Sequence, residues 1–196
     1  MMNYEVKYSI ATYTIENQKE NLAILGVYDI NQLEYNKSIE ENVLNLKKNP
    51  DEEIIIESSL GGGVGFPGFG SSTNIIMENH KDGLNEYVSK IKEDSIIMFT
   101  NSDLYELIPI YILSLYAKKL NKKIICISVG VNKFRGKRIC NGFSFLWDNI
   151  QMHADESILI DYDLDDENVK NLTKQSETDL FFFNKFSKRL HSLIVK

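Results

Sequence analysis

Residues 94–131 read DSIIMFTNSDLYELIPIYILSLYAKKLNKKIICISVGV. Two short apolar runs, IIMF and IICISV, stand on either side of a longer segment that is also mostly apolar. Short continuous apolar runs are typical of strands buried on both faces, as central strands of a parallel sheet are. The longer segment predicts a helix, with Ser102 or Asp103 as its N-cap and Pro109 near its first turns. The stretch therefore predicts a strand, a helix and a second strand.

Outside this stretch, the chain continues to alternate between strand and helix patterns. Alternating, β-branched or apolar runs predict strands, and apolar residues at helical spacing predict helices. The expected strands are 4–15, 21–30, 52–59 and 156–164, and the expected helices are 36–49, 74–93 with a bend near Gly83, 142–154 and 177–196. This order predicts an α/β fold, a three-layer, mostly parallel sheet with helices on both faces.

Composition limits the class of protein. A chain of 196 residues with 43% hydrophobic content can bury one real core, so we expect a single domain over 1–196. The net charge of −6 argues against a nucleic-acid partner, because such partners select Lys and Arg. The two cysteines, Cys126 and Cys140, have no zinc or disulfide spacing, and no apolar run is as long as a spanning helix. A cytoplasmic protein is expected.

A glycine-rich stretch, SSLGGGVGFPGFGSS at 58–72, follows the expected strand 52–59. In open parallel sheets, ligands bind beyond the carboxyl ends of the strands, where this stretch falls. The backbone N–H groups of Gly61, Gly62, Gly63 and Gly65 would suit an anion such as phosphate. The pattern fits neither the dinucleotide fingerprint nor the P-loop. Phosphate contact and an unliganded surface loop are both open interpretations.

The order of these motifs resembles the nucleotide domain of the tubulin/FtsZ superfamily. Segment 60–100 is similar to the family's phosphate-side loop with the helix and strand that follow it. Segment 122–164 is similar in order to a strand of the bacterial division protein, its Phe-Glu-Gly-Lys-Lys-Arg turn, a helix and a strand. Asp29 would answer to another loop of the family. The resemblance implies a Rossmann-like GTPase-domain architecture, without the family's central helix and C-terminal domain.

The same resemblance assigns roles to three further residues. Arg138, in the matched turn, would meet a phosphate, Phe181 would stack on guanine, and Asn184 would read it. Under this interpretation GTP or GDP is the ligand. The alternatives are a solvated basic turn, in which Arg135 replaces the family's ribose-contacting glutamate, and a core position for Phe181 within the run FFF.

The family's glycine signature is replaced. Where the resemblance expects Gly-Gly-Gly-Thr-Gly-Thr-Gly, the chain reads NSDLYELIP at 101–109, in which Leu104, Tyr105 and Leu107 are bulky and Asp103 and Glu106 would repel phosphate. The family's activating acidic loop is also missing. The resemblance therefore implies a degenerate member without GTPase activity and without catalytic residues. No grouping of His, Cys and carboxylates has metal-ligand spacing, so no metal is expected, and no cofactor is expected unless GTP or GDP binds.

Three functions follow as expectations. The first is a binding or regulatory module of a prokaryotic cell-division or cytoskeletal filament system, with a filament protein or a second copy as partner. The second is an altered guanine-nucleotide-binding protein that uses Gly61 to Gly65. The third is an adaptor that contacts a membrane or partner through 180–196. Its apolar stripe would be Leu180, Phe183, Phe186, Leu190, Leu193 and Ile194, which also fits a helix that closes the core.

Overall fold

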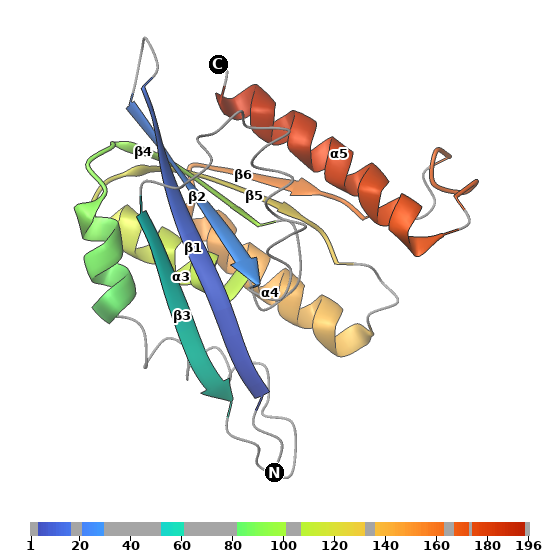
Figure 1. Ribbon diagram of the computed structural model, residues 1–196, viewed down its shortest axis with the longest axis horizontal. Coiled ribbons are helices and arrows are strands. Elements are labelled where there is room, and N and C mark those ends of the chain that lie inside the picture. The colour runs from blue at the N-terminus through green and yellow to red at the C-terminus, as the bar shows by residue number, and fades with distance from the viewer. Residues whose placement is uncertain are drawn as a thin grey trace.

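The computed structural model describes residues 4–16, 21–29, 52–60, 82–100, 107–131, 136–162, 167–172 and 174–194. They form one six-stranded sheet with helices packed on it (Figure 1). The strands are β1 (Tyr4–Glu16), β2 (Asn21–Asp29), β3 (Glu52–Leu60), β4 (Ser95–Thr100), β5 (Lys123–Val129) and β6 (Glu156–Ile160). The helices are a helix at 82–90, α3 (Leu107–Lys119), α4 (Lys137–His153) and α5 (Gln175–Ile194). The predicted helix 36–49 and the glycine-rich stretch after Leu60 lie outside the described residues.

The strand order is β3-β1-β2-β4-β5-β6, and β2, β4, β5 and β6 pair in parallel. The predicted α/β class with a mostly parallel sheet is confirmed. The first strand departs from that pattern, because β1 pairs antiparallel with both β2 and β3. Only 17–20 separate β1 from β2, and Glu16 lies opposite Asn21. Such a short connection permits a hairpin, whereas a parallel crossover needs a dozen or more residues.

The sheet has an apolar core on each face. In β4 all six side chains are buried, and they alternate, with Ile96 and Met98 in one cluster and Ile97 and Phe99 in the other. The first cluster packs against the helix at 82–90, α3 and α4, and the second packs against α5. Helices therefore cover both faces (Figure 1), and the prediction that this strand is buried on both sides is confirmed.

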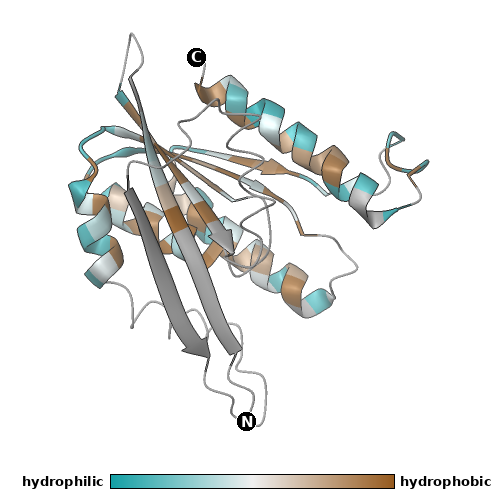
Figure 2. Cartoon of the chain, viewed as in Figure 1, coloured by the Kyte–Doolittle hydropathy of each residue, from teal (hydrophilic) through white to brown (hydrophobic). Residues whose placement is uncertain are grey.

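The last helix, α5, closes the second core. Phe182, Phe186 and Leu190 are buried against the sheet, and Leu193 and Ile194 continue the buried stripe. Figure 2 shows how apolar and polar residues alternate along this helix. The predicted stripe is wrong at its start, because Leu180 is 53% exposed and Phe182 takes the inward position. In that position the Phe182 ring stacks on the Tyr162 ring, at 4.3 Å between centroids.

Candidate functional site

The carboxyl ends of the parallel strands meet at one edge of the sheet. Asp29, Thr100 and Val129 end β2, β4 and β5 there, and Ile160 ends β6. We call this the carboxyl edge; the opposite edge, where these strands begin, is the amino edge. Ligands of open α/β sheets bind at the carboxyl edge.

β3 leads to the same edge. It runs in the direction of β2, because both are antiparallel to β1. Leu60 lies opposite Tyr4, whereas Asp29 lies opposite Tyr8, so the β1–β3 ribbon extends beyond the end of β2 (Figure 1). Gly61, Gly62, Gly63 and Gly65 follow Leu60 in the chain and lie outside the described residues. Their role in phosphate binding stays a prediction.

The start of α4 is open. Gly136 precedes the helix with φ 95° and ψ 149°, a conformation that is essentially restricted to glycine, and no side chain among the described residues caps the helix. The first turn contains no acidic residue, and Lys137 is exposed in it. Arg138 is the next residue, so Lys137 and Arg138 are helical and belong to the first turn of α4, whereas Arg135 of the expected basic turn lies outside the described residues. Free N–H groups at a helix start attract anions.

The start of α3 is closed. Its first four residues, Leu107, Ile108, Pro109 and Ile110, are all buried. Pro109 lies in the first turn, as predicted, whereas the proposed caps Ser102 and Asp103 lie outside the described residues. No acidic residue stands in this first turn. As far as the structure describes it, the helix start that follows β4 is therefore apolar and buried.

The first half of α5 also lies at the carboxyl edge. The Tyr162 hydroxyl, just beyond β6, donates a hydrogen bond of 2.5 Å to Asp179 Oδ1. Phe181 is half-buried, with the Lys185 ammonium 4.7 Å from its ring centroid, and Asn184 is exposed. The structure thus places Phe181 beside Phe182, whose ring stacks on Tyr162 just after β6, and Asn184 about one turn further along α5, while the side chain of Arg138 lies outside the described residues.

The sequence reasoning missed the Tyr162–Asp179 contact. These residues are far apart in the pattern and carry no motif; only an aromatic residue directly after a strand could have suggested it. Nearby, the Gly130 N–H donates to the Ile160 carbonyl at 2.8 Å, which ties the ends of β5 and β6 together. A Cβ at Gly130 would lie 3.4 Å from both Ile160 O and Tyr162 N, so a side chain there would have little spare room.

The described residues contain no group of three or more His, Cys, Asp or Glu side chains placed to hold a metal ion. In the same part of the chain, none of the helices is both long and apolar enough to span a bilayer. No protein-family model matches the sequence, and no curated protein matches it with significant similarity.

Proposed function

We propose that the chain is a binding or regulatory module of a tubulin/FtsZ-like filament system in the cytoplasm, without GTPase activity of its own. The similarity of segments 60–100 and 122–164 to that superfamily supports the proposal. The parallel order β4, β5, β6, with α3 and α4 between successive strands, agrees with it. Protomers of the family stack through the nucleotide face, so a related carboxyl edge could cover one end of a filament.

One observation carries the absence of hydrolysis in this proposal. The resemblance aligns the family's phosphate-binding glycines with 101–109, and the described residues at the end of that segment, Leu107 and Ile108, are buried at the start of α3. Glycine is used in such loops because the backbone must approach the phosphate closely. Branched side chains packed into the core leave no comparable approach. Phosphoryl transfer needs positioned groups around the γ-phosphate, so we expect the chain not to hydrolyse GTP.

The test combines phosphate release with filament sedimentation. The purified chain is incubated with GTP alone, and then with a purified FtsZ-type protein and GTP. We expect no phosphate release by the chain alone and a dose-dependent change in the amount of filament pelleted. GTP hydrolysis that Gly62→Ala or Gly63→Ala abolishes would contradict the proposal, as would an unchanged filament pellet.

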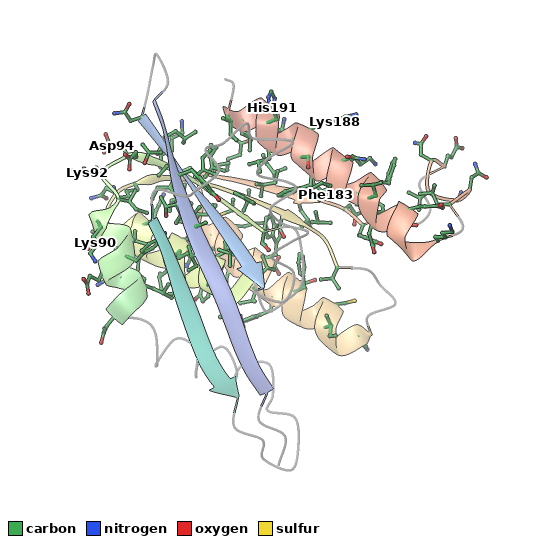
Figure 3. All side chains as sticks on the ribbon, in the orientation of Figure 1. Lys90, Lys92, Asp94, Phe183, Lys188 and His191 are labelled. Atoms are coloured by element: carbon green, nitrogen blue, oxygen red, sulfur yellow. The ribbon has the colours of Figure 1, made fainter. Side chains whose placement is uncertain are left out.

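A matched pair of charge reversals locates the contact. Lys137 is exposed at the carboxyl edge, whereas Lys92 is exposed near the amino edge, before β4 (Figure 3). Lys137→Glu should reduce the effect on filaments, and Lys92→Glu should not. Equal losses with both variants would show general charge attraction rather than contact through the carboxyl edge.

The open start of α4 favours a second candidate, an altered nucleotide-binding protein. Gly136, Lys137 and Arg138 begin the helix without an acidic residue, and a phosphate would be stabilised there by N–H groups and positive charge. Calorimetry with GTP, GDP and ATP tests it. We expect Lys137→Ala combined with Arg138→Ala to weaken binding at least tenfold, with Lys92→Ala as the control. Absence of binding by the unmodified chain would remove this candidate and leave the first.

Membrane contact through 180–196 has less support. Phe186, Leu190, Leu193 and Ile194 are packed in the second core and are not available for lipid. Lys188 and His191 are exposed on the side of α5 that points away from the sheet (Figure 3). Liposome sedimentation with the full chain tests this idea, and we expect no pelleting with neutral lipid.

A further inference from the structure

The outer side of β6 is an open sheet edge in the part of the chain that the structure describes. β6 stands last in the strand order, and β5 is its only hydrogen-bonded neighbour among the described strands. The Ile160 carbonyl accepts the Gly130 N–H, so Ile160 directs its backbone groups toward β5. The N–H and C=O of one strand residue point to the same side, and successive residues alternate. Ser157 and Leu159 therefore direct theirs outward.

After Glu156, the remaining four residues of this edge lack the charge and proline that usually oppose strand pairing. Natural edges are guarded by charged residues, proline, bulges or a covering element. Ser157, Ile158, Leu159 and Ile160 contain no charge and no proline, and their register with β5 is regular. An unguarded edge with strong β-forming residues is a template for another extended segment.

The side chains of β6 offer apolar contacts on both faces. Ile158 and Ile160 pack against the second core, on the side of α5. Leu159 points to the opposite face, that of α4, and is 38% exposed. A strand that pairs with β6 would place alternate side chains beside Leu159 on one face and beside the two isoleucines on the other. Such cross-strand apolar pairs stabilise a sheet.

The charges at the two ends of β6 determine which kind of segment can pair with it. At the amino end of β6, Glu156 already faces Arg189, at 3.7 Å. At the carboxyl end, Asp161 is exposed and begins the acidic sequence DYDLDDE at 161–167. Two copies of β6 paired antiparallel would bring Asp161 of one copy toward Glu156 of the other, which is repulsive. A basic partner segment would instead complement the acidic end.

We infer that the outer side of β6 is a docking site for an extended peptide with apolar residues and a basic N-terminal end. Antiparallel pairing, which is slightly more stable per residue than parallel pairing, would place that end beside Asp161. The site touches the carboxyl edge at Asp161, and the inference does not rest on the proposed function. Main-chain hydrogen bonds would supply affinity, and the basic residues would supply direction.

Fluorescence anisotropy with a labelled peptide, Lys-Arg-Lys-Val-Thr-Val-Thr-Val, tests the inference. Two control peptides accompany it: one N-methylated at alternate valines, with the same charge, and one with Glu in place of the three basic residues. We expect saturable binding that falls at least tenfold with either control. No saturable binding, or equal binding of the N-methylated peptide, would overturn the inference.

Protein variants locate the site. Leu159→Lys places a charge on the exposed side chain of β6, and Leu120→Lys, at a leucine 42% exposed after α3, is the matched control. We expect Leu159→Lys to weaken peptide binding at least tenfold and Leu120→Lys to leave it unchanged, with thermal melts to show that both fold. If the chain forms a dimer that Leu159→Lys dissociates, a second copy occupies the edge and the inference is wrong.

Discussion

The helices α3 and α4 both begin at the carboxyl edge after a parallel strand, yet their first turns differ. α3 begins with apolar side chains packed in the core, whereas α4 begins with an exposed glycine and basic residues. A helix start can bind an anion only where its N–H groups can be approached. The same topology thus gives one helix start that is packed in the core and one that is available to solvent or a ligand.

The largest expected effect concerns the packed start. Leu107 is fully buried at the first position of α3, so Leu107→Ala removes apolar contacts and leaves a cavity. We expect a loss of about 2–5 kcal/mol in the free energy of unfolding. Urea unfolding measures it, with Leu120→Ala, at an exposed leucine, as the control. A loss no larger than that of the control would mean that the start of α3 is not packed.

At the open start of α4, a substitution should lower stability through backbone strain rather than through lost packing. Gly136 has φ 95°, and a Cβ added there would have no atom within 4 Å, so Gly136→Ala meets no clash but strains the backbone. We expect a loss of about 1–3 kcal/mol. Gly83, which is exposed in the helix at 82–90 with equal space, is the control, and Gly83→Ala should maintain or raise stability. Equal effects of the two substitutions in urea unfolding would contradict the difference.

The sequence predicted the centre of this fold better than its ends. The apolar runs of β4 and β5 identify buried parallel strands because burial on both faces leaves no polar alternation. The antiparallel pairing of β1 with β2 depends on a short connection. The position of β3 beside β1 depends on which of the available strand edges β3 pairs with. The hydrophobic periodicity of the sequence indicates neither of these two pairings.

The candidate site was predicted only in part, for a similar reason. The expectation that the carboxyl edge carries it rests on topology, which local patterns can predict. Leu180 is exposed and Phe182 is buried against Tyr162, and this contact between a loop and a helix is not recorded in the local pattern. The start of α4 at Lys137 depends on the conformation of Gly136, which composition alone could not distinguish from a turn.

At the amino edge, a side chain links the end of α3 to the start of β5. The carboxylate of Asp155 accepts the Ile124 N–H at 2.9 Å and the Lys118 ammonium at 3.0 Å. The backbone hydrogen bond first, and then Lys118, lower the pKa of Asp155. Because solvent screens this half-exposed group, we expect Asp155→Asn to cost only about 1 kcal/mol at pH 7.

The contribution of Asp155 to stability should depend on pH in one direction. A lowered carboxyl pKa stabilises the folded state above the unfolded pKa, which is about 3.9 for Asp. This contribution is lost as the pH falls through the lower folded pKa. The difference between Asp155→Asn and the unmodified chain in urea unfolding should therefore shrink on acidification. A difference that stays constant from pH 7 to strong acid would show a steric cause, and Glu86→Gln, at an exposed pair with Lys90, should have little effect at any pH.

The smallest expected effect concerns a buried hydroxyl in the second core. Ser187 lies on α5 with 5% of its surface exposed, and its hydroxyl has no hydrogen-bond partner among the described residues. A buried hydroxyl without a partner costs free energy, so Ser187→Ala should stabilise the chain by up to about 1 kcal/mol. Ser192→Ala is the control, because the Ser192 hydroxyl donates to the Arg189 carbonyl at 2.7 Å on the exposed side. A clear loss of stability with Ser187→Ala would mean that the hydroxyl is satisfied, by water or by a bound group, and that this core contains a polar site.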